Sequence, residues 1–263
     1  MNRLDTRGSD AAGTAGADRL DGVPGQHRPP DVRTARAPAS GKSRSLARSA
    51  ALFGRLLPGP RRTPFTFWYG LVLLGTALLA EHAEPATVSV LLRESSTDVA
   101  HLARTPALVL VASALWVAGG LLSPYTIGFV LVLTALERRV GGLRTAGIFL
   151  LGHVLATLLT EIPVGLAVAV GHLPETSLHR LDYGISFGIM ASAGALAGLL
   201  PPLARWILLT AIGAALLQDL LEFADPITDW GHVLALLIGV ACWPALRSRR
   251  VRSVTCAGRC SRP

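Results

Sequence analysis

The chain has 263 residues, of which 51% are hydrophobic, 6% aromatic and 16% charged, and its formal net charge is +8. The apolar residues are concentrated in long runs of Ala, Leu, Gly and Val, which argues against a soluble globular protein because such runs do not suit surface helices. The positive charge does not indicate nucleic-acid binding, since the arginines gather toward the two ends of the chain and no basic groove interleaved with aromatic residues is evident.

Six apolar blocks are long enough, or nearly so, to cross a bilayer, which takes about 20 residues of helix. They are residues 64–80, 106–136, 145–170, 184–200, 205–221 and 231–246. We therefore expect an all-α fold, a polytopic bundle of six transmembrane helices.

The flanking segments lack such blocks. Residues 1–60 are predicted to be a disordered basic tail, with a candidate interfacial helix over 43–57 or, equally, a solvated basic linker. Residues 61–247 form the predicted membrane domain, and 248–263 a second basic tail. A secretory signal is not expected, because no apolar core precedes Phe65.

The charges between the blocks predict the orientation. Arginines mark one set of loops: Arg138, Arg139, Arg144 and Arg205, followed by the basic C-terminal segment. Carboxylates dominate the other set: Glu81, Glu84, Glu94, Asp98, Glu175, Asp182, Glu222, Asp225 and Asp229. The positive-inside rule then places both termini in the cytoplasm, and we expect an integral protein of the plasma membrane in contact with lipid.

A serine and a histidine lie just inside two of these blocks. Ser186 comes four residues after Asp182, and His232 three residues after Asp229, so both are expected roughly 5–6 Å below their acidic markers. Polar groups at that depth are costly unless they have partners. A Ser–His pair is the minimum set for base-activated attack on a carbonyl. The alternative is purely structural: Ser186 bonds its own helix backbone and His232 lies at a helix start.

Small residues favour close packing of the same two blocks. Gly231, Ala235 and Gly239 recur at four-residue spacing in the last block, and the 184–200 block is rich in Gly, Ala and Ser. Such faces let membrane helices approach closely, so we expect the two blocks to touch.

Three motifs in this order resemble those of the rhomboid family of intramembrane serine proteases, over about residues 65–247. The family's G-x-S-G resembles the run from Gly184 to Ser186, and its H-x-x-G-x-x-x-G resembles the run from His232 to Gly239, with Ala235 replacing the first glycine. Its E-x-x-x-G resembles Glu137 to Gly141. The resemblance implies six spans, with Ser186 as the nucleophile, His232 as the general base, and transmembrane proteins as substrates.

The chain departs from the family's pattern at several positions. Phe187 follows the serine where the family has glycine, and the first outer loop, 81–105, lacks the family's Trp-Arg pair. The family's H-x-x-x-N, whose side chains stabilise the oxyanion, corresponds to Leu121 and Tyr125. The oxyanion-supporting candidates are therefore Tyr125 and Gly184.

Two functions follow. One is an intramembrane serine endopeptidase; the alternative is a catalytically inactive rhomboid-fold protein that binds transmembrane client helices. A small-solute transporter using Glu161 and Asp219 is a weaker third hypothesis. For His153 and Glu161 we expect bonds to Thr157, Thr160 or neighbouring spans. The sequence indicates no cofactor and no metal site, since Cys242, Cys256 and Cys260 do not form a ligand pattern.

Overall fold

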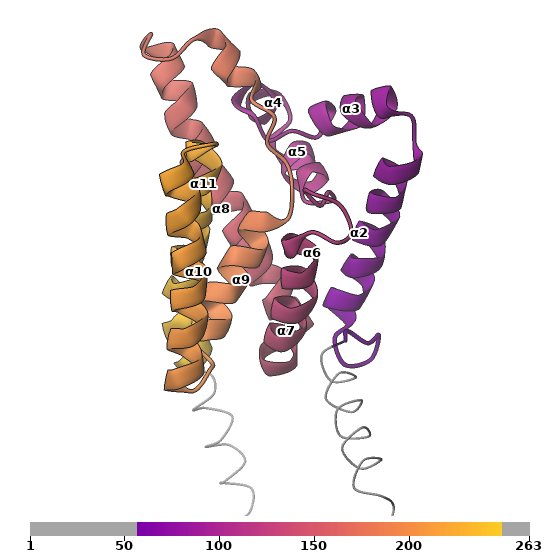
Figure 1. Ribbon diagram of the computed structural model, residues 1–263, viewed down its shortest axis with the longest axis vertical. Coiled ribbons are helices and arrows are strands. Elements are labelled where there is room, and N and C mark those ends of the chain that lie inside the picture. Colours follow the sequence, from indigo (N-terminus) through magenta and orange to yellow (C-terminus); the bar gives the residue numbers. More distant parts are fainter. Residues whose placement is uncertain (1–56, 249–263) are drawn as a thin grey trace, which may run out of the picture.

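The computed structural model describes residues 57–248, and within these residues the regular secondary structure is entirely helical (Figure 1). The elements are α2 (Pro64–His82), α3 (Pro85–Glu94), α4 (Val99–Arg104), α5 (Pro106–Ser113), α6 (Pro124–Gly128), the π-helical η1 (Phe129–Leu133), α7 (Thr134–Val140), α8 (Gly142–Ala169), the 3-10 helix η2 (Glu175–His179), α9 (Ser186–Ala197), α10 (Pro202–Glu222) and α11 (Pro226–Ala241). The predicted tails and the candidate helix over 43–57 lie almost wholly outside the described residues.

Four helices are long and apolar enough to cross a membrane: α2, α8, α10 and the helix Pro226–Ser248, which contains α11. Large apolar side chains stand exposed on their outer faces, among them Trp68, Leu203 and Leu221. Such a surface is unfavourable in water, whereas a bilayer surrounds it with acyl chains. The chain is therefore an integral membrane protein, as its sequence predicts.

The block 106–136 does not form one helix, so the span predicted there is wrong in its bounds. Helix α5 ends at Ser113, and the chain turns through Gly119 and Gly120, which both have φ of +79°. Ser123 then caps a new helix by accepting a hydrogen bond from the Thr126 N–H at 3.3 Å. Helix α6, η1 and α7 continue from there without a break to Val140. Two left-handed glycines and a fresh N-cap override an apolar composition that suits a single span.

Helix α9 lies at the centre of the bundle, between α8 and α11. It has 12 residues, about 18 Å of helix, and all of them except Ser186 and Met190 are buried. Ala191 touches both neighbours: a Cβ atom added at Gly152 of α8 would overlap its side chain, and one added at Gly239 of α11 would overlap its carbonyl oxygen. The contacts between the predicted small-residue stripe and the fourth block are thus confirmed.

Replacing Gly239 by leucine should destabilise this crossing strongly. The new side chain would meet backbone atoms of Ala191 and Ala195, which cannot move aside as a flexible side chain can. We expect a loss of at least about 1–3 kcal/mol in the free energy of unfolding, the usual range for overpacking. Unfolding in detergent measures it. Gly213→Leu on α10 is the matched control, because a Cβ atom at Gly213 meets nothing within 4 Å. Equal stability of the two variants would contradict the close crossing.

Glu137 joins the start of α2 to the turn between α7 and α8. Its carboxylate accepts hydrogen bonds from the backbone N–H of Phe65 and Thr66 at 2.9 and 2.8 Å, and from the Thr66 hydroxyl at 2.6 Å. Negative charge at a helix N-terminus is favourable. Gly141, with φ of +85°, then lets the chain reverse into α8. The E-x-x-x-G motif therefore has a structural role in this fold.

Candidate functional site

Ser186 is the first residue of α9, and its side chain is half-buried. The segment before it is held in place by Gly184, whose φ of +125° suits glycine and whose N–H donates to the Ser113 carbonyl at 3.0 Å. A link to the end of α5 thus sets where α9 begins.

His232 lies in the second turn of α11. This helix begins at Pro226, earlier than predicted, because the Asp225 side chain caps it by accepting from the Thr228 N–H at 3.3 Å. The His232 side chain is buried, with 3% exposure, and neither ring nitrogen has a hydrogen-bond partner among residues 57–248. Since buried polar groups are nearly always paired, this histidine is an exception that calls for an explanation.

Two aromatic rings flank His232. The Phe187 ring meets it edge-on, with centroids 5.4 Å apart, and the Tyr125 ring lies 6.1 Å away at an interplanar angle of 33°. A Cβ atom added at Gly231 would overlap the Phe187 ring, so a glycine is needed there. The residue that follows the serine therefore fills the space beside the histidine.

The structure thus brings the serine-bearing end of α9 next to the histidine of α11, but it shows no hydrogen bond between Ser186 and His232. The two helices run parallel: Phe187 meets Gly231, and further along Gly194 meets Leu236 and Gly239. This register places both candidate residues toward the same ends of two packed helices. Attack by Ser186 would require the two side chains to approach further.

The two supporting candidates differ in their availability. Tyr125, at the start of α6, stands beside the histidine ring, as an assisting group would. The Gly184 N–H is already engaged by Ser113, so it is not a free donor to an oxyanion in this conformation.

A second serine–histidine contact occurs deeper in the bundle. His153 Nε2 lies 3.1 Å from Ser113 Oγ and 3.0 Å from the Leu110 carbonyl, and both side chains are buried. Because Nε2 must donate its proton to a carbonyl, it cannot at the same time accept one from Ser113. The pair joins α5 to α8 as a structural contact. The hydrogen bond of Glu161 goes to Arg180, outside its own helix, and not to the neighbouring Thr157 or Thr160.

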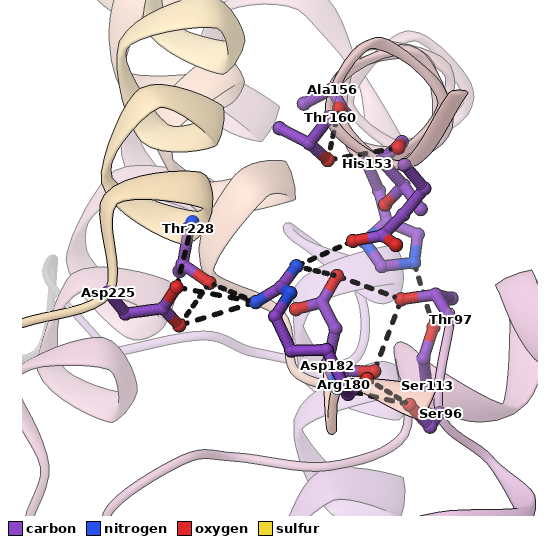
Figure 2. A network of polar contacts seen from close by, with 12 residues as sticks. Ser96, Thr97, Ser113, His153, Ala156, Thr160, Arg180, Asp182, Asp225 and Thr228 are labelled. Atoms are coloured by element: carbon purple, nitrogen blue, oxygen red, sulfur yellow. Dashed lines mark hydrogen bonds and ion pairs between the residues drawn. The ribbon is translucent and has the colours of Figure 1, made fainter. Parts of the chain in front are cut away.

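Arg180 is the partner of Glu161 and the hub of the network shown in Figure 2. Its guanidinium donates to Glu161 Oε1 on α8 at 2.5 Å and to Thr228 Oγ1 on α11 at 3.0 Å, and it lies 3.3 Å from an Asp225 carboxylate oxygen. It thereby connects the loop that enters α9 with the first turn of α11. Ser186 directly follows that loop and His232 lies one turn further along α11, so Arg180 ties together the two segments that lead to the candidate residues.

The same loop is anchored on its other side by Asp182. Thr97 donates to its carboxylate at 3.0 Å and, through the backbone N–H, to its carbonyl at 2.8 Å; the Asp182 N–H donates to Ser96 Oγ at 3.0 Å (Figure 2). Burial raises the pKa of Asp182, although the Arg180 charge 3.8 Å away and the Thr97 hydroxyl oppose this. Burial also disfavours the charge of Arg180, but the surrounding carboxylates of Asp182, Glu161 and Asp225 outweigh it and raise the pKa of Arg180.

Arg180 could have been recognised from the sequence as an arginine in a carboxylate-rich loop beside a block that contains Glu161. A buried carboxylate needs a cation or several donors, and Arg180 is the arginine nearest to it in that loop. Among residues 57–248, no three or more His, Cys, Asp or Glu side chains are grouped to hold a metal ion.

These features define a class of integral membrane protein. A short central helix is enclosed by longer ones; it begins at a serine and packs on a neighbouring helix that carries a buried histidine. The chain belongs to the rhomboid family, since the model of a family described as rhomboid-like protein matches residues 60–252. A search of curated proteins and a search of solved structures each found no match.

Proposed function

We propose that this rhomboid-family protein is an intramembrane serine protease in which Ser186 is the nucleophile and His232 the general base. The observation that supports this most is the His232 ring, which is buried against the helix that begins at Ser186 and has no hydrogen-bond partner for either nitrogen among residues 57–248. An unpaired buried polar group costs about 1–3 kcal/mol. A cost of this kind is typical of a group kept ready for reaction.

The chemistry requires a small approach of the two side chains. Ser186 Oγ attacks the carbonyl carbon of a peptide bond while His232 takes the hydroxyl proton. His232 then gives this proton to the leaving amine, and water hydrolyses the acyl-enzyme in the reverse sequence. The N–H groups in the first turn of α9 have no partners within their own helix and point toward this end, so they can stabilise the oxyanion together with the Tyr125 hydroxyl.

The second candidate function is that of an inactive rhomboid-fold protein that binds transmembrane helices of client proteins. Two observations favour it. The Phe187 ring fills the space next to His232, and the Gly184 N–H is engaged by Ser113. Loss of one oxyanion donor lowers rates by about 10²–10³-fold.

Labelling with a fluorophosphonate probe distinguishes the two functions. We expect the wild-type protein to be labelled and Ser186→Ala not to be. Ser192→Ala is the matched control on the same helix, because the Ser192 hydroxyl is buried and donates to the Gly188 carbonyl at 2.7 Å. Labelling that survives Ser186→Ala but is lost in Ser113→Ala would move the site to the deeper pair. Absence of labelling in the folded wild type would favour the client-binding function.

We further propose six spans: α2, the continuous stretch α6–η1–α7, α8, α9, α10 and α11, with both termini cytoplasmic. Reporters fused after Arg93, Arg144, Leu178, Leu203, Ala224 and Arg252 should alternate out, in, out, in, out, in, because most of the arginines, with Arg93, Arg104 and Arg180 as exceptions, belong to the segments assigned to the inner side. A reporter on the wrong side at Leu178 or Ala224 would place Ser186 or His232 toward the cytoplasm and contradict this topology.

A further inference from the structure

A cavity of about 460 Å³ opens at the end of the bundle where α7 ends and α8 begins. Its lining is mostly apolar, and the apolar side chains include Ile148 and Leu151 of α8, Leu199 after α9 and Leu246 after α11. Figure 1 shows these segments converging at the end of the bundle where both described chain ends lie. The cavity is remote from Ser186 and His232, which lie near the starts of α9 and α11.

Two arginines line this cavity, Arg139 and Arg144, and neither has an acidic partner among the described residues. Arg139 donates through Nη1 to the Ala135 carbonyl at 2.7 Å. This bond does not use the Nε and Nη2 groups of its guanidinium. In the part of the chain from 57 to 248, no carboxylate forms an ion pair with Arg139 or Arg144. The nearby Glu137 is committed to the start of α2.

Three other arginines at this end of the bundle are engaged, whereas Arg61 and Arg62, just before α2, do not line the cavity. Arg205 and Arg247 donate to carbonyls at the end of α9 and lie over the Trp243 ring, at 5.2 and 4.8 Å from its centroid. Arg138 donates to the Leu57 carbonyl at 3.0 Å and does not line the cavity. Among residues 57–248, the cationic groups that line the cavity are therefore Arg139 and Arg144.

We propose that this cavity is a binding site for one anionic phospholipid. The phosphate pairs with Arg139 and Arg144, and one acyl chain lies along the wall formed by Ile148 and Leu151. An anion alone would leave the apolar wall uncovered, and a neutral lipid would leave both arginines without a counter-charge. Basic pockets between membrane helices suit the headgroups of anionic lipids, and the positive-inside arrangement places this end at the anionic leaflet.

Cys242 lines the cavity and provides the readout. In the full chain with Cys256→Ser and Cys260→Ser, it is the only remaining thiol of three. The rate at which a neutral maleimide labels Cys242 in neutral detergent is measured with added phosphatidylglycerol, with phosphatidylcholine of the same acyl chains, or with glycerol 3-phosphate. We expect phosphatidylglycerol to slow labelling at much lower concentration than phosphatidylcholine, and glycerol 3-phosphate to have little effect.

Two kinds of variant test the assignment. Arg139→Gln/Arg144→Gln should weaken the apparent affinity for phosphatidylglycerol by roughly thirtyfold, at about tenfold per 1.4 kcal/mol and about 1 kcal/mol per arginine. Arg138→Gln, the adjacent control, should leave it unchanged. Gly147→Trp should also weaken binding. Gly147 lines the cavity and a Cβ atom there meets nothing within 4 Å, so the new side chain occupies space in the cavity while both arginines are kept.

Three outcomes would overturn the proposal. Equal protection by phosphatidylcholine would mean that charge plays no part, and equal protection by glycerol 3-phosphate would mean that the site binds a free phosphate. Undiminished protection in both the double arginine variant and Gly147→Trp would place the lipid elsewhere. The unfolding temperature of each variant without added lipid reports whether it is folded.

Discussion

Ser186→Ala and His232→Ala are each expected to abolish cleavage of a co-expressed single-span substrate. In a nucleophile–base pair, removal of either partner eliminates the step that both perform, and the loss in turnover can reach about 10⁶-fold. The double variant should be no worse than either single one, because the residues act as one unit. The measurement is the fraction of substrate cleaved in membranes, with the amount of each variant determined on the same blot.

The controls for this experiment come from the structure. Ser192→Ala removes a buried hydroxyl from the same helix and should keep activity, since that hydroxyl serves the Gly188 carbonyl. Ser113→Ala tests the hydrogen-bonded pair with His153, which we regard as structural. Cleavage that persists in Ser186→Ala, with the variant folded, would contradict the proposed protease and leave the client-binding function.

The sequence predicted several membrane helices closely, because hydrophobic length is a strong signal. Helix α2 begins at the predicted Pro64, and α8 and α10 differ from the predicted blocks by at most three residues at each end. The contact of Gly239 with α9 was also predictable, since small residues at four-residue spacing make one smooth face.

The division of the block 106–136 was not predictable from hydropathy. Its middle is as apolar as a span, yet Gly119 and Gly120 adopt left-handed conformations and the hydroxyls of α2 bind the carbonyls that the break exposes. Tyr69 donates to the Ala114 carbonyl at 2.5 Å and Thr76 to that of Leu115 at 2.6 Å. These bonds come from a segment distant in sequence, so a local pattern does not contain them.

The candidate site shows the same limit at the scale of single side chains. Spacing from Asp182 and Asp229 placed Ser186 and His232 near the starts of two helices that do pack together. It did not foresee that the Phe187 ring would lie against the histidine, because that depends on the space left by Gly231 on the neighbouring helix. Depth follows from counting residues, whereas side-chain direction follows from packing.

Arg180→Gln is expected to reduce both stability and reactivity, because it removes a cation that joins α8, the loop before α9 and the start of α11. Glu161 is 1% exposed and would be left as a buried charge without its partner. Breaking a buried pair in this way costs about 3–5 kcal/mol. Arg93→Gln is the matched control, since Arg93 is exposed on α3 and forms no ion pair among residues 57–248.

Two further measurements separate a positioning role for Arg180 from a general loss of stability. Adding Glu161→Gln to Arg180→Gln should recover part of the lost stability, because the unpaired charge is removed with its partner.

The pKa of Asp182 is already raised by burial and should rise further without the arginine. A carboxyl whose pKa is raised in the folded state favours folding most at low pH and loses that contribution as the pH rises through its folded pKa. The stability gap between Arg180→Gln and the wild type should therefore widen as the pH rises. A gap that does not change with pH, together with unchanged probe labelling at temperatures where the variant is folded, would mean that Arg180 neither holds the Asp182 loop nor positions Ser186.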